Sequence, residues 1–455
     1  MIRLRKVGLM GIMLCSFLLF SFFWSCESIF GKTSWSQEVK VHILKDVYIL
    51  PAAELVTTKT HPDIIEIANE YLKVSVVPNR GRLVFDYFFK PTDHSQLYNS
   101  SRPSPTMTPA GYIVEFGGYY LSVPWNPRAR QPYDLEYRIV EDTPAKAKVY
   151  LWGKDPLKHI LMEGWITIRQ SSSLVKIKVK LTNKGKKKWN IKLSDYAVIA
   201  PGGRLTSNST FLIPTSKVKI GKSENEWMGK EGSVVNWPQS WSNWSGFKQL
   251  GSFSTEIEEM SAPFIGMINY DSKDTFIKLW EPPNFFDELK IWSWGVSFEE
   301  MKGGTPTANL ENKKRAFSLS PDESVEFFTY FYALGEMENL TMANINFAGW
   351  ISPDKTLYSL DKDRFLQVKS QVGASKNHEN LNLAIYLLNQ KEELVKEIHR
   401  EQIDTISPRG PYSVAFKIKL GDLPDVESRY SLKAQLSDAQ GSILFAAKSA
   451  LFTVK

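Results

Sequence analysis

Short runs of β-branched and aromatic residues fill the chain from residue 37 to the C-terminus. The run LVKIKVKLTN at 174–183 alternates apolar residues with lysine or threonine, so its side chains point in turn to a core and to solvent. Such runs recur about every 8–14 residues, bounded by Pro, Gly, Asn or Asp, and no long segment has the period of an amphipathic helix. This pattern predicts a large, antiparallel, all-β architecture.

The strand pattern is interrupted at 336–356, where GEMENLTMANINFAGWISPDK ends in a proline and a lysine. A chain of 455 residues is expected to form two or three domains, so we interpret this segment as a linker. It separates a large β domain at 37–335 from residues 357–455, whose six or seven short runs are typical of a small immunoglobulin-like sandwich. Within the latter, EELVKEIHREQI (392–403) is either a helix or two strands with a kink, and its neighbours favour strands.

The N-terminus has the pattern of an export signal. MIRLRK is basic and is followed by apolar residues at 7–25, as in a signal peptide or an N-terminal membrane anchor. Residues 1–26 are therefore excluded from the fold. The only two cysteines are Cys15 and Cys26, so residues 27–455 contain neither a disulfide nor a thiolate metal site.

The sequence around Cys26 resembles the lipobox of bacterial lipoproteins, with the small Ser25 before it, although Trp24 departs from the usual pattern. Lipidation of Cys26, plain cleavage and an uncleaved anchor remain open. Each places residues 27–455 outside the cytoplasm, and we expect a lipid-anchored protein of the cell envelope. Contact with the membrane is expected through this lipid or anchor.

The net charge does not indicate a nucleic-acid partner. The formal value of +7 includes Arg3, Arg5 and Lys6 of the export signal, so only a mild excess remains elsewhere. The densest basic run, NKGKKKW at 183–189, lies between two strand-like runs and contains a glycine. It is interpreted as a solvated hairpin turn rather than as a patch for an anionic ligand. The oligomeric state is not indicated.

Tryptophan is unusually concentrated: 11 of the 14 indoles lie between Trp125 and Trp294. Indoles stack on the apolar faces of sugars, whose hydroxyl groups bind amides and carboxylates. In VVNWPQSWSNWSGF (234–247) tryptophan alternates with such amides, which favours a loop at the rim of a site over a loop with buried indoles. Trp292 and Trp294 share one face of a predicted strand, either in a core or in a site. The candidate ligand-binding indoles are Trp237, Trp241, Trp244, Trp280, Trp292 and Trp294.

Four stretches together resemble an uncharacterised, exported bacterial family built on a galactose-mutarotase-like supersandwich. They are ANEYLKVSVVPNRGRLVFDYFFKPTDHSQLY (68–98), APFIGMINYDSKDTFIKLW (262–280), LKIWSWG (289–295), which matches the family's closing W-x-W-G signature, and FSLSPDESVEFFTYFYAL (317–334). The resemblance implies a mutarotase-like supersandwich with a concave sheet face that binds sugars. It spans residues 60–335 and agrees with the strand count.

Mutarotases use a His that protonates the ring oxygen and a Glu that removes the anomeric proton. By the resemblance, the His strand corresponds to IKLSDYAVI, which has Asp195 or Tyr196 at that position. The Glu strand corresponds to TPTANLENKKRAF, with Asn309 or Glu311 near the place. The usual pair is therefore not found, and a mutarotase of the usual mechanism is not expected.

Other candidates are single residues. The family's GGR turn corresponds to Arg80-Gly81-Arg82, in which Arg80 replaces a glycine. Arg82 could clamp hydroxyl groups or a uronate, or form an edge salt bridge. His94 could reach the concave face or lie in a surface loop. Glu115, flanked by Val and Phe, resembles a family Glu and could donate a proton if burial raises its pKa. With Asp195 it would supply the two carboxylates of glycoside hydrolysis.

The leading interpretation is an exported carbohydrate-binding protein with an aromatic concave site. The first alternative is a carbohydrate-active enzyme, a hydrolase, lyase or non-standard epimerase, that uses carboxylates or Tyr196 in place of the missing His. The second is a non-catalytic scaffold of the cell envelope. No cofactor is expected, and no metal site, because the six histidines have no metal-ligand spacing.

Overall fold

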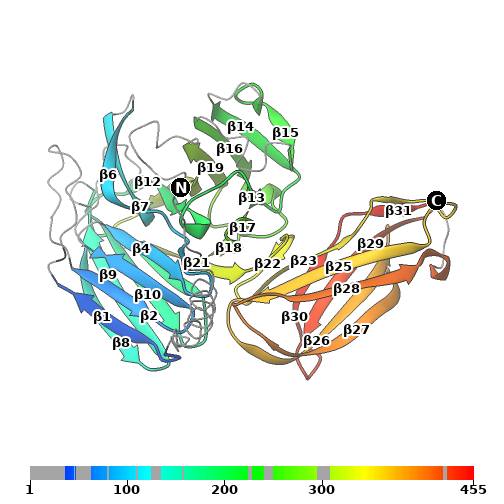
Figure 1. The fold of residues 1–455 in the computed structure, drawn as a ribbon. Coiled ribbons are helices and arrows are strands. Elements are labelled where there is room, and N and C mark those ends of the chain that lie inside the picture. The colour runs from blue at the N-terminus through cyan, green and yellow to red at the C-terminus, as the bar shows by residue number, and fades with distance from the viewer. Residues whose placement is uncertain are drawn as a thin grey trace, which may run out of the picture. The chain divides into compact units, whose positions relative to one another are not determined.

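A computed structural model describes residues 36–45, 47, 63–78, 81–108, 111–123, 135–155, 158–223, 228–239, 250–294, 308–423 and 428–455. Contacts divide the chain into Met1–Ser36 and Gln37–Lys455, and all strands lie in the second unit. The described ranges form strands and a few short 3-10 turns, which confirms the all-β prediction (Figure 1). Within these ranges no helix is both long enough and apolar enough to span a bilayer.

A thirteen-stranded antiparallel sheet is the largest element. β5 (His94–Ser95) pairs with β4, and β6 (Asn99–Thr108) pairs with β7, beside the main path. The main path runs in the order β1 (Lys40–Leu44), β2 (Ile64–Ala68), β3 (Leu72–Val77), β4 (Arg82–Phe89), β7 (Gly111–Ser122), β12 (Trp189–Ile199), β20 (Ala308–Leu319), β19 (Glu288–Trp294), β16 (Leu250–Glu256), β14 (Lys217–Ser223) and β15 (Val234–Asn236).

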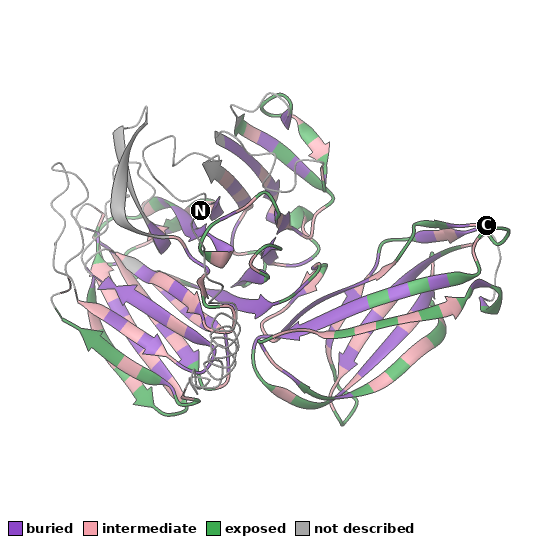
Figure 2. Cartoon of the chain, in the orientation of Figure 1, coloured by how far each residue is buried: buried purple, intermediate pink, exposed green. Residues whose placement is uncertain are grey.

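An eight-stranded antiparallel sheet packs against it across one apolar core. In β11, Ile177 and Val179 are fully buried, while Lys178 between them is partly exposed. Buried and partly exposed residues alternate along the strands of the sheets (Figure 2). The predicted alternation is confirmed, because one face of this sheet is solvated. The order is β13 (Ser209–Leu212), β17 (Phe264–Asn269), β18 (Asp274–Glu281), β21 (Ser324–Gly335), β11 (Val175–Asn183), β10 (Ile160–Arg169), β9 (Lys146–Lys154) and β8 (Glu136–Thr143).

The basic run at 183–189 does not form the predicted hairpin turn. It connects β11 of the eight-stranded sheet to β12 of the thirteen-stranded sheet, and these strands pair with other partners. Its lysines are exposed, as expected. Turn residues show where a strand ends, but they do not show which sheet the next strand joins.

The C-terminal part is a sandwich of two sheets with its own core. The four-stranded sheet contains β22 (Met342–Ala343), β23 (Phe347–Pro353), β25 (Phe365–Ala374) and β28 (Tyr412–Lys419). The six-stranded sheet contains β24 (Leu357–Tyr358), β31 (Phe452–Val454), β29 (Arg429–Ser437), β26 (His378–Asn389) and β27 (Leu394–Ile406), with β30 (Ile443–Lys448) beside β29.

Two details of this sandwich differ from the expectation. The segment 336–356, expected to be a linker, contains β22 and β23, and β23 pairs with β25 along its whole length. Phe347 and Ile351 of β23 enter the sandwich core, while Trp350 packs in a separate cluster with Tyr332 of β21. The segment 392–403 lies mainly in one continuous strand, β27, whose pairing with β26 is interrupted by register shifts instead of a break.

Candidate functional site

The face of the thirteen-stranded sheet that points away from the inter-sheet core is here called the outer face. In β12 the core side is formed by Ile191, Leu193, Ala197 and Ile199. Because side chains alternate along a strand, Ser194, Tyr196 and Val198 lie on the outer face. The ring of Tyr120 from β7 stacks on Tyr196 with centroids 5.0 Å apart and planes 15° apart. With Val198, these two rings form a small buried cluster.

Glu311 of β20 lies on the same outer face, directly opposite Tyr196 in the strand pairing. Glu311 is only 1% exposed. One carboxylate oxygen accepts a hydrogen bond from Ser194 Oγ at 2.8 Å, and the other accepts one from Trp292 Nε1 at 2.9 Å. Lys313 Nζ lies 3.5 Å from the second oxygen. The carboxylate is thus held in a fixed orientation and its charge is compensated.

Trp292 of β19 belongs to this outer face and not to the core. Its strand neighbours Leu289 and Ile291 are core residues, whereas Lys290 and Trp292 alternate with them. The indole is partly exposed, and Lys290 Nζ lies 3.7 Å from its ring centroid. Partial burial lowers the pKa of Lys290 to about 8, and the nearby charge of Lys313 acts in the same direction.

Asn309 completes the described part of this group. It lies opposite Val198 on one side and Trp292 on the other, and it is 2% exposed. Its side-chain oxygen has no hydrogen-bond partner within the described structure. A buried amide oxygen without a partner is costly, so this position favours a donor from a ligand or from water.

Asp195 lies on the opposite, core side of β12 from Tyr196. It is fully buried and forms an ion pair with Lys278 of β18. Asp195 Oδ2 also accepts hydrogen bonds from Thr329 Oγ1 at 2.8 Å and Tyr119 OH at 3.1 Å. Burial lowers the pKa of Lys278 and raises that of Tyr119. Asp195 therefore connects the two sheets and does not lie on the outer face with Tyr196, where the prediction required it.

Two predicted ligand-binding indoles are core residues instead. Trp280 is fully buried, and its Nε1 donates to the carbonyl oxygen of Pro283 at 3.1 Å. Trp237 is 8% exposed and stacks on Phe253 with centroids 5.2 Å apart. For Trp237 this agrees with the alternative of a loop with buried indoles, and Trp280 lies in the core of the two sheets. Indoles pack in an inter-sheet core as readily as they stack on a sugar. A high tryptophan content therefore does not distinguish a core from a sugar site.

His94 has a structural partner. Its Nδ1 lies 2.9 Å from the carboxylate of the fully buried Asp274, which Gln96 and Thr92 also contact. This carboxylate fixes the turn between β4 and β5 to β18. Two further predicted residues, Trp241 and Trp244, lie outside the described residues. Arg82, Glu115 and Trp294 lie in described strands, but their side chains are outside the description.

Four residues of the group did not stand out in the sequence: Lys290, Lys313, Ser194 and Tyr120. Residues two apart in a strand share a face of the sheet. Lys290 therefore lies on the same face as Trp292, and Lys313 lies on the same face as Glu311. That signal is usable only when one residue of each strand is already assigned to the site. Among described residues, no group of three or more His, Cys, Asp or Glu could hold a metal ion.

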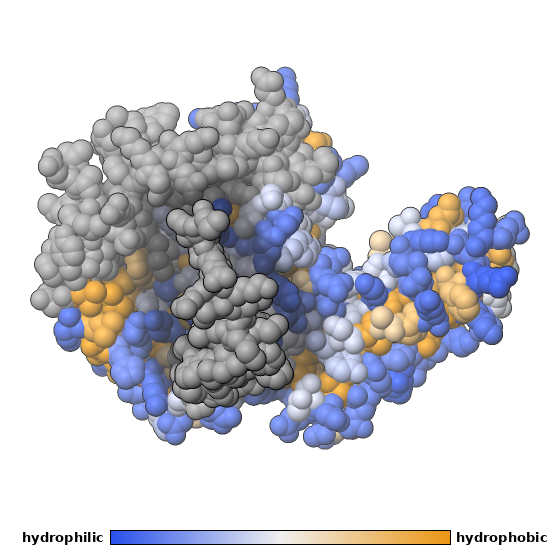
Figure 3. All heavy atoms as spheres, in the orientation of Figure 1, coloured by the Kyte–Doolittle hydropathy of each residue, from blue (hydrophilic) through white to orange (hydrophobic). Residues whose placement is uncertain are grey.

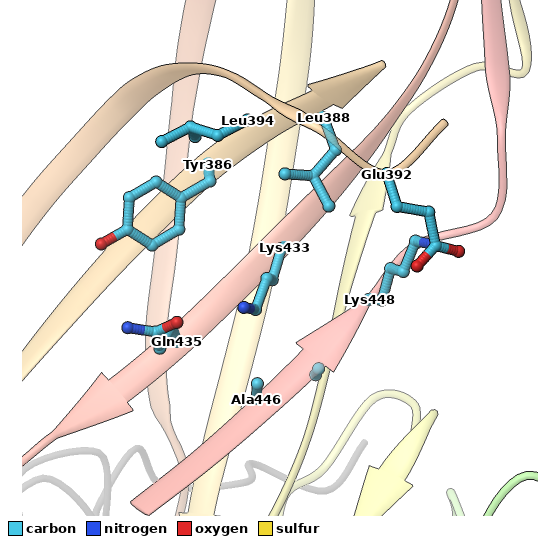
Figure 4. A pocket seen from close by; sticks show the side chains of 9 residues that line it. Tyr386, Leu388, Glu392, Leu394, Lys433, Gln435, Ala446 and Lys448 are labelled. Carbon is cyan, nitrogen blue, oxygen red and sulfur yellow. The ribbon is translucent and has the colours of Figure 1, made fainter. Parts of the chain in front are cut away.

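An open groove of about 420 Å³ lies on the C-terminal sandwich (Figure 4). Tyr386 and Leu388 of β26, Lys433 and Gln435 of β29, and Lys448 of β30 line it. Lys448 forms an ion pair with Glu392. The surface of this sandwich mixes hydrophobic and hydrophilic residues (Figure 3). The residues that line the groove include no tryptophan, unlike the outer face of the thirteen-stranded sheet.

No protein-family model matches the chain, and no curated protein matches it. Solved structures do match. A putative aldose 1-epimerase from Klebsiella pneumoniae has a TM-score of 0.51 and 10% identity, over 65% of this chain and 88% of that protein. A TPR-domain containing protein from Parabacteroides distasonis has a TM-score of 0.50 and 14% identity, over 68% of this chain but only 55% of that protein.

A galactose mutarotase-like protein from Clostridium acetobutylicum has a TM-score of 0.46 and 10% identity, over 65% of this chain and 99% of that protein. At these identities the likeness concerns the fold alone. The match to the Klebsiella protein confirms a mutarotase-like fold over about two thirds of the chain, with the additional sheets of the C-terminal sandwich.

Proposed function

We propose that this protein binds carbohydrate on the outer face of the thirteen-stranded sheet. The observation that carries the proposal is the fixed pair of Trp292 and Glu311, in which the indole nitrogen donates to the carboxylate. An indole offers a flat apolar surface for the C–H face of a sugar, and a carboxylate accepts hydrogen bonds from its hydroxyl groups. The mutarotase-like fold supports a role connected with carbohydrate.

The hydrogen-bonding capacity of the group suits a polyol. Each carboxylate oxygen of Glu311 accepts one hydrogen bond from a neutral side chain in the described structure, and a carboxylate can accept about four hydrogen bonds in all. Asn309 adds an acceptor without a partner in the described structure. Tyr196 and Tyr120 add an apolar wall next to these acceptors.

Catalysis is a second candidate function, and one observation favours it. Tyr196 and Glu311 are cross-strand partners. Tyr196 is one of the two residues that the resemblance offers for the His of a mutarotase, and Glu311 is one of the two that it offers for the Glu. In such an enzyme Glu311 would accept a proton from the sugar, and the Tyr196 hydroxyl would donate one in place of the imidazole. A polarimetric or NMR assay of anomer exchange, and a reducing-end assay of hydrolysis, distinguish this enzyme from a binding protein.

We further propose that the protein acts outside the cytoplasm and is held in the cell envelope by lipid on Cys26. The basic and apolar N-terminal segment and the small residue before Cys26 support this location. Metabolic labelling with a fatty-acid analogue tests it. Label that is present in the natural chain and absent in Cys26→Ala is expected, whereas equal labelling contradicts lipidation at this cysteine.

Binding is tested with a glycan array followed by calorimetry on the full chain in detergent. We expect Trp292→Ala to weaken binding about fivefold or more, because stacked aromatic contacts contribute about 1 kcal/mol or more beyond buried area. Tyr386→Ala, in the groove of the C-terminal sandwich, is the matched control and should bind normally. Absence of binding to any glycan contradicts the proposal and favours the scaffold alternative.

A further inference from the structure

Lys290 is a cation without an ion-pair partner in the described part of the chain. Its ammonium group is partly buried over the ring of Trp292, at 3.7 Å from the centroid. By contrast, Lys313 on the neighbouring strand lies 3.5 Å from Glu311. Two lysines on the same outer face thus differ: one is near a carboxylate and the other lies on an aromatic ring.

The surrounding acids do not complete an ion pair with Lys290. Glu311, Glu288 and Glu231 attract its charge, and Lys313 repels it, but no carboxylate among the described residues lies within 4.0 Å of its ammonium group. The carboxylate of Glu311 accepts hydrogen bonds from Ser194 and Trp292 and forms its ion pair with Lys313. A partly buried ammonium without an ion pair favours an anion supplied from outside.

We propose that the ligand of the outer face is an acidic sugar, a uronic acid residue whose carboxylate pairs with Lys290. This inference rests on the proposed function, because it assumes that a sugar stacks on Trp292. It makes Lys290 a specificity-determining residue of that site.

A ligand that stacks on this face of Trp292 must displace the ammonium group of Lys290. A sugar that stacks on the indole face under Lys290 moves the ammonium off the ring, so the cation–π contact is lost. A neutral sugar offers the displaced ammonium no ion pair. A uronate offers the displaced ammonium a charge-assisted hydrogen bond, which is stronger than a neutral one. Lys290 thus disfavours neutral sugars and favours acidic ones.

The experiment compares uronic acid oligosaccharides with their methyl esters, which keep the shape and lack the charge. The panel contains oligomers of galacturonate, glucuronate and mannuronate, and affinities are measured by calorimetry on the full chain. We expect at least one acid to bind about tenfold or more tighter than its ester. In Lys290→Met, which keeps the apolar stem, that preference should disappear, and the ester should bind as well as before or better.

Lys433→Met, in the groove of the C-terminal sandwich, is the control for a loss of charge elsewhere and should keep the preference. Circular dichroism and thermal unfolding show that each variant is folded. Equal affinity for acid and ester in the natural chain, unchanged in Lys290→Met, overturns the inference and leaves the proposed function standing. If glycans of the array bind but no uronate does, the inference also fails alone. If no glycan binds, both fail.

Discussion

Tyr196 and Glu311 lie directly opposite each other on β12 and β20, with both side chains on the outer face of the thirteen-stranded sheet. The same pairing places Asp195 opposite Asn312, one residue away and on the core side. The strand register therefore separates two acids that the sequence left as comparable candidates. Glu311 is bound by Ser194 and the partly exposed Trp292 on the outer face, whereas Asp195 belongs to the contact between two sheets.

Replacement of Glu311 by Gln is expected to weaken glycan binding about 10- to 100-fold, because hydrogen bonds to a charged group contribute about 1.5–3 kcal/mol. The variant also weakens the fixed position of Trp292, since the indole nitrogen then donates to a neutral oxygen. Glu326→Gln is the control, because Glu326 forms an exposed ion pair with Lys178 on the eight-stranded sheet. Calorimetry that finds equal affinities for both variants would remove Glu311 from the site.

Affinity for a uronic acid oligosaccharide should fall as the pH rises from 7 to 9.5. Lys290 has a pKa of about 8, below its ordinary value, so its ammonium is mostly charged at pH 7 and mostly neutral at pH 9.5. The carboxylate of the ligand stays ionised throughout. Titrations at a series of pH values should show this loss in the natural chain, and a flat profile in Lys290→Met. A midpoint that is the same in both proteins would assign the effect to another group.

The buried pair of Asp195 and Lys278 should be essential for stability. Replacing Lys278 by Met leaves a buried carboxylate without its cation, which costs about 3–5 kcal/mol in comparable cases. The double replacement Lys278→Met with Asp195→Leu removes both charges and should recover much of the loss. Lys273→Met, from the exposed pair with Glu336, should change little. Urea unfolding measures all of these, and a single variant as stable as the natural chain would contradict this role.

Gly118 should tolerate no side chain. Its φ is +73°, and a Cβ atom would lie 2.4 Å from the carbonyl oxygen of Val84, so Gly118→Ala should destabilise strongly or prevent folding. Gly203, with a φ of +79° and no atom within 4 Å of such a Cβ, isolates the backbone effect. Gly203→Ala should cost only about 1–2 kcal/mol. Thermal unfolding compares them, and equal losses would show that the close approach to β4 is not limiting.

Much of this fold can be predicted from the sequence, because successive side chains of a strand point to opposite faces. The spacing of two residues along a strand therefore tells whether they share a face. The alternation in β11 and the shared face of Lys290 and Trp292 follow from it. Which of the two faces enters the core depends on packing between distant strands. For that reason Asp195 and Trp280, both core residues, looked like residues of a site. Strand β23 was missed for the same reason. Its core residues Phe347 and Ile351 lie among polar residues that we interpreted as a linker.

The most direct test of the sugar site observes the Trp292 indole itself. In a protein with ¹⁵N-labelled tryptophan, the resonance missing from Trp292→Phe identifies its Nε1–H group. We predict that addition of a glycan selected on the array shifts this resonance, because the ligand contacts the ring and alters the hydrogen bond to Glu311. An unchanged Trp292 resonance under saturating glycan would contradict a sugar site on the outer face of the thirteen-stranded sheet.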